Sequence, residues 1–205
     1  VLNIDKPEEK VLDGWSVAAM IKELLEGYTA RLEQRTLPDT PTLPKFRDYV
    51  DAELSSLQDE QSKTYWQTLM AKSDIPPWHG QGVTQHHTDT LDLSEYYEDI
   101  YALSAEIEVP VRTILLAVHL FVLAKICGAE RIVSSVVSHG RLEVANSDKC
   151  LGLFLNTQPV LATLVHPTWR DFIQSVNKQL MDNWPHRHYP VAQIQRDTGI
   201  DLSGA

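Results

Sequence analysis

Apolar residues recur at helical spacing through the first half of the chain. Between residues 13 and 35 they lie three and four positions apart, on one face of an α-helix: Val17, Met20, Ile21, Leu24, Leu25 and Tyr28. The same spacing predicts a second long helix over residues 46–72 and a third over residues 93–109. Residues 36–45 are rich in proline and have no such period, so we expect a connector there.

Two apolar segments in the second half predict β-strands. Residues 131–140 and 151–164 are rich in valine, isoleucine, leucine and phenylalanine, which favour strands. A shorter alternating stretch from Thr84 to Leu93 predicts an edge strand. The helix expected over residues 111–127 is apolar on nearly all sides, so we expect it to be central and buried.

Two further helices are expected after the second strand, at residues 168–184 and 189–197. Helices therefore alternate with apolar strands along the chain. This order predicts an α/β fold in which helices cover a mixed sheet. A chain of 205 residues is long enough for one domain with a sizeable core.

Charge and composition exclude several classes of function. The net charge of −10 argues against a general nucleic-acid binder, which needs a basic face to neutralise phosphates. The longest apolar run, Ile114 to Cys127, is too short to cross a bilayer and contains His119 and Lys125. The first residues show no secretory pattern, and the two cysteines cannot form a disulfide framework. We therefore expect a cytoplasmic protein that does not act at a membrane.

Common catalytic and metal-binding motifs are missing or poorly spaced. The sequence has no nucleophile elbow, phosphate-binding loop or dinucleotide-binding fingerprint. The string "QHHTDT" offers His86, His87 and Asp89 as zinc ligands, but adjacent residues of a strand point to opposite faces. His186 and His188 lie in the turn-like string "PHRHYP" and are expected to pack rather than to bind metal. We therefore expect no metal site.

Four short strings occur in order along the chain: "LDGWS" (12–16), "FRDYV" with "TYW" (46–66), "LGLFLNTQPV" (151–160) and "HRHYPVAQIQ" (186–195). Their order and spacing resemble the condensation domain of nonribosomal peptide synthetases. The resemblance extends from Val11 to about Gly199, which is nearly the whole chain. Any one string would be weak support, whereas four in register favour this family strongly.

The resemblance implies the two-lobed fold of chloramphenicol acetyltransferase. In this family a donor acyl or peptidyl thioester and an acceptor aminoacyl thioester meet in a tunnel between the lobes and are joined by an amide bond. The family motif His-His-x-x-x-Asp-Gly stands at the end of the first lobe. Residues 11–205 would therefore be the C-terminal lobe of a condensation domain with the end of this motif, as a fragment of a larger protein. Residues 1–10 would be an atypical N-terminal segment.

The partners are also implied by the resemblance. They would be phosphopantetheinylated carrier-protein domains, the N-terminal lobe that this chain lacks, and a neighbouring adenylation domain. The domain would need no cofactor of its own, because the carrier domains hold the phosphopantetheine. Two rival interpretations are a catalytically inactive docking or scaffold module, and a free-standing acyltransferase of the same fold that uses a coenzyme A thioester.

The motif departs from the family at its first two positions. Asp13 and Gly14 match its end and Trp15 follows as in peptide-forming members, but Glu8 and Glu9 stand where the histidines would be. Glu9 takes the position of the catalytic histidine, and a glutamate of pKa ~4.3 is a weaker base than a histidine of pKa ~6.5. Three interpretations are open: the atypical segment is foreign to the domain, the domain is inactive, or Glu9 is a working base.

The remaining site residues come from different parts of the chain. Asp13 could shape the site or only cap the helix that follows it. Arg141 could pair with Asp13 or cap a turn. Trp15, Arg141 and Asn156 are expected along the substrate tunnel, and the alternative for Asn156 is an amide that is satisfied within the core.

Overall fold

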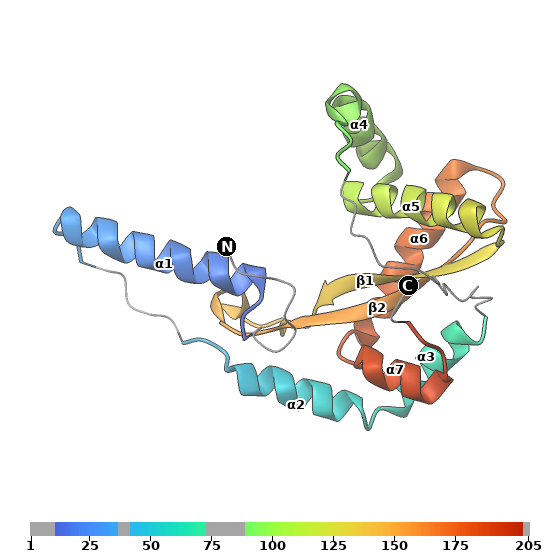
Figure 1. Cartoon of the computed structure of the whole chain (residues 1–205). Coiled ribbons are helices and arrows are strands. Elements are labelled where there is room, and N and C mark those ends of the chain that lie inside the picture. Colours follow the sequence, from blue (N-terminus) through green and yellow to red (C-terminus); the bar gives the residue numbers. More distant parts are fainter. Residues whose placement is uncertain (1–10, 37–41, 73–88, 203–205) are drawn as a thin grey trace.

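The computed structural model describes residues 11–36, 42–72 and 89–202. Helices predominate, and Figure 1 shows α1 extending away from the sheet while α5 and α6 lie against it. The elements are α1 (Gly14–Leu32), α2 (Phe46–Ser56), α3 (Glu60–Met70), η2 (Ser94–Tyr96), α4 (Tyr97–Ile107), α5 (Val111–Cys127), β1 (Arg131–His139), η3 (Ser147–Lys149), β2 (Leu155–Thr163), α6 (Trp169–Asn183), η4 (Trp184–His186) and α7 (Val191–Thr198).

The two strands form an antiparallel pair in the middle of the body. Their register joins Arg131 to Thr163 at one end and His139 to Leu155 at the other. The expected α/β class is confirmed. The sheet of the described residues is two-stranded and antiparallel, however, and contains none of the parallel pairs of the mixed sheet that we expected.

The edge strand expected over Thr84 to Leu93 is wrong for the part that the structure describes. Residues 89–93 form no strand. Leu91 is exposed, and the Asp92 carboxylate accepts a hydrogen bond from the Ser94 backbone N–H at 2.9 Å. This aspartate therefore starts the helical segment η2–α4 instead of entering a ladder. Residues 84–88 lie outside the described ranges.

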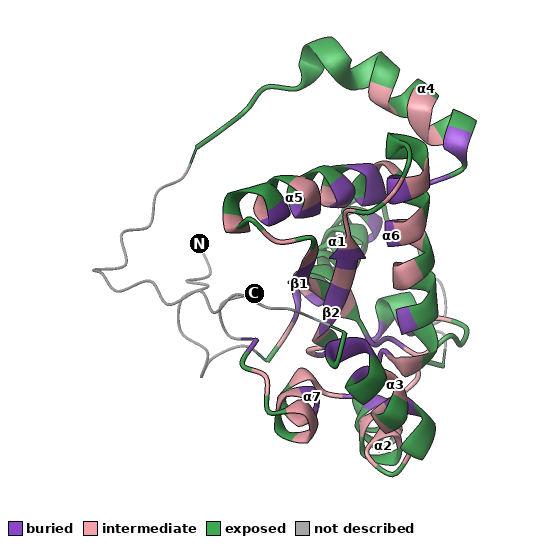
Figure 2. Ribbon diagram, turned by 90° about the vertical axis from the view of Figure 1, so that its right-hand side faces the viewer, coloured by how far each residue is buried: buried purple, intermediate pink, exposed green. Residues whose placement is uncertain are grey.

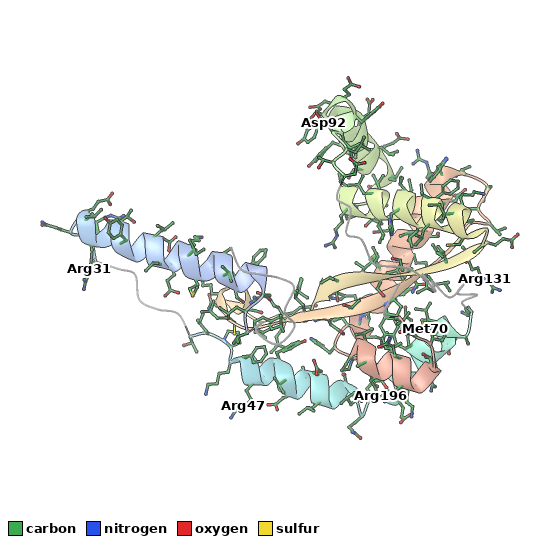
Figure 3. The ribbon with its side chains drawn as sticks, viewed as in Figure 1. Arg31, Arg47, Met70, Asp92, Arg131 and Arg196 are labelled. Carbon is green, nitrogen blue, oxygen red and sulfur yellow. The ribbon has the colours of Figure 1, made fainter. Side chains whose placement is uncertain are left out.

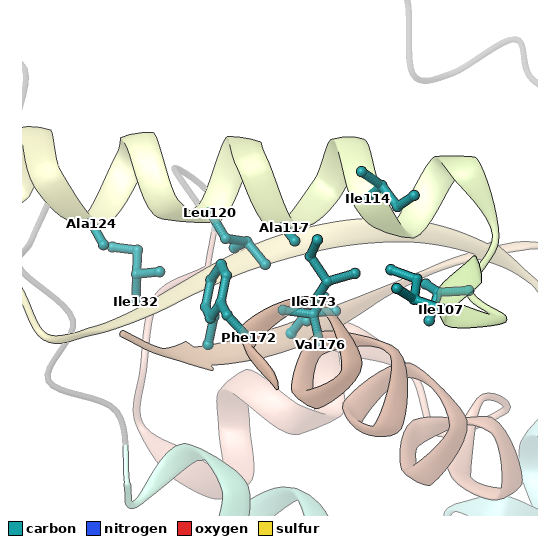
Figure 4. Packing of buried hydrophobic residues seen from close by; sticks show 12 residues of the cluster. Ile107, Ile114, Ala117, Leu120, Ala124, Ile132, Phe172, Ile173 and Val176 are labelled. Atoms are coloured by element: carbon teal, nitrogen blue, oxygen red, sulfur yellow. The ribbon is translucent and has the colours of Figure 1, made fainter. Parts of the chain in front are cut away.

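The main hydrophobic core lies between the sheet and the two helices α5 and α6 (Figure 4). From α5, Leu120, Ala117 and Ala124 are fully buried, and they meet side chains of β1, β2 and α6. Small residues at two of these positions let the helix approach the sheet closely. The members of this core are Ile107, Val109, Ile114, Ala117, Leu120, Ala124, Ile132, Val160, Ala162, Phe172, Ile173 and Val176.

The expectation that residues 111–127 form a fully buried helix is wrong for one face. Figure 2 shows α5 buried towards the sheet and exposed on its outer side. Four large apolar residues of that outer side are 43–69 % exposed: Leu115, Val118, Val122 and Ile126. The apolar character all round this helix therefore does not arise from complete burial within the described residues.

A second cluster covers the other side of the sheet, where α3 and α7 meet it. Trp66, Tyr189 and Ile194 are at most 1 % exposed and pack with Val133 of β1. The single helix expected over residues 46–72 is divided into α2 and α3. The break comes just before α3, where Asp59 caps the new helix by accepting hydrogen bonds from the Gln61 and Ser62 N–H groups.

Helix α1 contacts the body mainly through its first turn (Figure 1). Arg31, near its far end, lies well away from the sheet in Figure 3. The apolar face predicted from the sequence is present but uncovered: Met20, Ile21, Leu24, Leu25, Tyr28 and Leu32 are 43–71 % exposed. No single helix of the described residues is long and apolar enough to cross a membrane. Residues 94–107 and 111–127 reach the required length and apolar composition only when they are taken together, and the two helices are bent by 101° at the break between them.

Candidate active site around Asp13 and Arg141

Asp13 stands at the N-terminus of α1 and is 4 % exposed. Its carboxylate accepts hydrogen bonds from the Ser16 N–H at 2.7 Å and from the Phe154 N–H at 3.3 Å. Burial by itself would raise the pKa of this carboxyl, but the hydrogen bonds from Ser16, the charge of Arg141 and the Phe154 N–H outweigh it and lower the pKa. Asp13 is therefore held as an anion inside the protein.

Arg141 supplies the positive charge that balances Asp13. Arg141 is 7 % exposed, and its Nη2 lies 3.0 and 3.2 Å from the two Asp13 carboxylate oxygens. The other terminal nitrogen, Nη1, donates to the carbonyls of Ser147 and Cys150 at 2.9 and 2.7 Å. The sequence left open whether this arginine pairs with Asp13 or caps a turn, and it does both. A buried ion pair with its other donors satisfied is costly to break from one side.

Ser16 completes this buried polar cluster. Its hydroxyl donates to the Gly152 carbonyl at 2.9 Å and accepts from the Gly152 N–H at 3.1 Å and from Arg141 Nη2 at 2.9 Å. The Asp13 N–H also donates to the Gly152 carbonyl, at 3.0 Å. A Cβ atom at Gly152 would lie 2.3 Å from the Phe46 ring, so only glycine fits this close approach. The strings "LDGWS" and "LGLFLNT" are thereby joined.

Gly14 and Trp15 lie on the outer side of this junction. A Cβ atom at Gly14 would meet nothing within 4 Å. Trp15 is 63 % exposed, and its indole N–H donates to the Asp148 carbonyl at 2.9 Å, which fixes the ring on the surface. Glu9, the remaining predicted catalytic residue, lies outside the described residues. The structure thus brings Asp13, Gly14, Trp15 and Arg141 together in one place.

The Asn156 side chain forms hydrogen bonds with four backbone groups. Its amide nitrogen donates to the carbonyls of Arg187 and Tyr189, both at 2.9 Å, and its oxygen accepts from the N–H groups of Thr157 and Val191. Every polar atom of the side chain is therefore bound to backbone. This arrangement ties β2 to the turn that follows η4.

A polar cluster at the ends of β1 and η4 was not predicted from the sequence. Glu143 accepts hydrogen bonds from the Arg187 guanidinium at 3.0 Å and from the Trp184 indole at 2.8 Å. The Arg187 guanidinium also lies 4.3 Å from the Trp184 ring centre, and the His139 ring meets the same indole edge-on at 5.6 Å. Arg187 stands in the string "HRHYPVAQIQ", and His139 lies two residues before the candidate Arg141, so the sequence did contain a signal. Their proximity depends on the strand register and on the turn held by Asn156.

The histidines of the string "PHRHYP" have protein partners. His186 stacks on Tyr65 at 4.2 Å and shares a hydrogen bond with Ser62 at 2.9 Å, while His188 Nε2 contacts the Gly140 carbonyl at 2.8 Å. Throughout the described part of the chain, no three His, Cys, Asp or Glu side chains converge as metal ligands would. Most of the string "QHHTDT" lies outside that part.

The sequence matches the family model described as "Condensation domain" over residues 10–203. Among curated proteins, AMB antimetabolite synthetase AmbE of Pseudomonas aeruginosa is 31 % identical over 196 residues, which cover 91 % of this chain and 9 % of that protein. Nonribosomal peptide synthetase 8 of Aspergillus fumigatus is 24 % identical over 200 residues, covering 93 % of this chain and 2 % of that protein. The chain thus spans less than a tenth of these two relatives.

The fold agrees with solved structures of the same kind. The first condensation domain of the calcium-dependent antibiotic synthetase superposes with a TM-score of 0.76 at 20 % identity. The superposition covers 95 % of this chain and 48 % of that one, so the chain spans about half of the solved domain. The resemblance seen in the four sequence strings is therefore confirmed, and the chain belongs to the condensation-domain family.

Proposed function

We propose that this chain is the C-terminal part of a domain that forms an amide bond between two carrier-bound thioesters in a nonribosomal peptide synthetase. The observation that carries the proposal is the buried Asp13–Arg141 pair, with Nη2 at 3.0 Å from the carboxylate. It anchors the Asp-Gly end of the family motif to the loop before β2. The catalytic position, Glu9, comes four residues before this anchor in the sequence.

The contacts of Asp13 support a structural part for it in this reaction. Its carboxylate receives hydrogen bonds from Ser16, Arg141 and Phe154, and its lowered pKa makes it a poor proton acceptor. Asp13 therefore fixes the loop that precedes α1 and does not exchange protons with the substrates. Gly14 and Trp15 lie on the open side of this loop, where we expect them to border the substrates. Arg141 is buried beneath them and holds the loop in place.

The reaction joins an amine nitrogen to a thioester carbon and releases a thiol. The amine must lose a proton as the new bond forms, and a positioned base accelerates such steps. At the position of the family's catalytic histidine this chain offers the Glu9 carboxylate. A carboxylate of ordinary pKa ~4.3 is the weaker base unless its surroundings raise that value.

Carrier-protein domains and an adenylation domain are the proposed partners, since the curated relatives are synthetases of which this chain spans 9 % and 2 %. The carriers would bring both substrates on phosphopantetheine, so the chain would need no cofactor of its own. We also expect the intact protein to work in the cytoplasm. All these partners would lie on other parts of a long polypeptide or on separate polypeptides.

The N-terminal half of the domain is the proposed cover for the apolar face of α1. An isolated helix of 19 residues with six large apolar side chains in water gains little stability from its own hydrogen bonds. About half of the solved domain lies beyond the part that this chain covers. A helix that protrudes with one apolar face is therefore best explained as an element that packs against that other half.

A docking or scaffold module without catalysis is the second candidate. The observation in its favour is the pair Glu8 and Glu9 in place of both motif histidines. Such a module would keep the Asp13–Arg141 anchor because the fold needs it, and it would bind carriers without joining their substrates.

The deciding experiment is an amide-formation assay on the full-length protein with loaded donor and acceptor carriers. It is run with Glu8 and Glu9 in place and with both changed to histidine. Product from the unchanged protein supports the enzyme. Product from the histidine variant alone means that the glutamates disable a condensation domain. If neither protein forms product but the carriers still bind, the scaffold takes the place of the enzyme.

A further inference from the structure

His139 is the last residue of β1 and lies two residues before Arg141. Residue 139 is exposed within the described part of the chain, and its ring meets Trp184 edge-on at 5.6 Å. In the described part of the chain, neither ring nitrogen has a hydrogen-bond partner. An imidazole with both nitrogens open therefore stands next to the cluster that anchors the family motif.

The backbone that carries this imidazole is rigidly held. The Gly140 N–H donates to the Phe154 carbonyl at 2.6 Å, and the Gly140 carbonyl contacts His188 Nε2 at 2.8 Å. A Cβ atom at Gly140 would come within 2.5 Å of the Tyr49 ring. These contacts fix the backbone next to His139, and the Trp184 ring borders the imidazole on one side.

The charges around His139 favour its neutral, proton-accepting form. Partial burial of the ring is the main cause that lowers its pKa below the ordinary 6.5, and Arg141, Arg187 and Arg112 add to this effect. Asp13 acts in the opposite direction, but its effect on the pKa is the smallest of these. At neutral pH the ring is therefore free to take up a proton.

The other histidines of the described residues are less suited to accept a proton beside the motif anchor. His119 lies on the outer side of α5 and His166 beyond the far end of β2. His186 and His188 are engaged with Ser62 and with the Gly140 carbonyl. Within the described residues, His139 thus unites an open imidazole with a place beside the motif anchor.

We propose that His139 is the proton acceptor of the amide-forming reaction, in place of the histidine that Glu9 replaces. This inference rests on the proposed function. In the step, the acceptor amine attacks the donor thioester carbon, the new C–N bond forms and the C–S bond breaks. His139 takes the proton that the amine nitrogen loses and returns it to the departing thiolate, which leaves as a thiol. Atoms and charges balance without any further reactant.

The test is the amide-formation rate of the full-length protein with loaded carriers, for the wild type, His139→Gln, His139→Ala and Glu9→Gln. Glutamine keeps the size and a hydrogen-bonding group but cannot carry the proton. We expect His139→Gln to lower the rate by about 10²–10⁴-fold, the usual contribution of a general base. His119→Gln, an exposed histidine on α5, is the matched control and should keep the wild-type rate.

Two further readouts separate a chemical role from a structural one. The wild-type rate should fall as the pH drops through the His139 pKa, below 6.5, and this limb should be absent in His139→Gln. Added imidazole should restore part of the activity of His139→Ala, because a free base can enter the space of the deleted ring.

Each possible outcome has a distinct meaning. A His139→Gln protein that is as active as the wild type, with the same acidic limb, overturns the assignment and leaves the proposed function standing. Loss of activity in Glu9→Gln alone assigns the base to Glu9 instead. A His139→Gln protein that is inactive because it misfolds would show a changed melting curve. In that case the His139→Ala variant is used: rescue of its activity by imidazole supports the assignment, and no rescue overturns it. A wild type that forms no amide overturns the assignment of His139. If the variant with histidines at positions 8 and 9 is also inactive, the proposed function is overturned as well.

Discussion

Two buried regions of the described chain are held together by opposite means. Between α5, α6 and the sheet, apolar side chains such as Leu120 and Val176 fill space without directional bonds. Around Asp13, by contrast, Arg141 and Ser16 satisfy one another through hydrogen bonds in fixed geometry. A packed core tolerates changes that keep its volume, whereas a buried polar cluster fails when one member is lost. The part that anchors the family motif is thus the less forgiving of the two.

Removing the charge of Arg141 should have the largest effect. The Arg141→Met variant leaves the Asp13 carboxylate buried without its cation, and we expect a loss of about 3–5 kcal/mol in the free energy of unfolding. Urea denaturation followed by circular dichroism measures this loss. Arg47→Met, on the exposed side of α2 (Figure 3), is the control and should change stability by less than about 0.5 kcal/mol. Equal stability of the two variants would contradict the role given to the pair.

A cavity in the apolar core should cost somewhat less on average. Leu120 is fully buried, so Leu120→Ala should lose about 2–5 kcal/mol, while Leu120→Met should lose less than about 1.5 kcal/mol. Val122→Ala, on the outer side of the same helix and 48 % exposed, serves as the matched control. The same denaturation experiment applies. If Leu120→Met proved as harmful as Leu120→Ala, the apolar core would not be the more tolerant of the two regions.

Acid should weaken the polar cluster selectively. The pKa of Asp13 is lowered in the folded protein, so its contribution to stability is present above the ordinary value of 3.8 and is lost as the pH falls through the lowered value. Below pH 4 we therefore expect the wild type to lose more stability than Asp13→Asn, which has no carboxylate to protonate. Thermal melts between pH 5 and pH 2.5 test this. Parallel curves for the two proteins would show that the pair has no such effect.

The smallest effect on stability is expected on the outer face of α1. Leu24 is 71 % exposed, so Leu24→Lys should leave the free energy of unfolding within about 0.5 kcal/mol. It should nevertheless reduce self-association and binding of a hydrophobic dye by the isolated chain, because an uncovered apolar face promotes both. Glu23→Gln, on the same helix, is the control. A wild-type chain that stays monomeric and binds no dye would contradict the proposal that this face is normally covered.

The sequence predicted the helices well where a capping residue marks the start or the end of the helix. Asp13 and Thr168 cap the helices expected after them, and Gly128 ends α5 in the left-handed conformation that glycine favours. The break between α2 and α3 was missed although Asp59 is a good cap, because the apolar period continues across it. The exposed side of α5 was missed for a related reason: apolar composition does not say which partner covers a surface.

The candidate site, like the helices, could be predicted from the sequence only in part. The sequence by itself determined the family, through four strings in order, and the residues at the motif, including the two glutamates in place of histidines. It also identified Arg141 and Asp13 as candidates. Only the tertiary structure decided that these two form a buried pair 128 residues apart, that Asn156 binds backbone, and that His139 stands beside them. Periodicity and caps act over a few residues, whereas such contacts depend on strand register and close packing between distant segments, which no local pattern encodes.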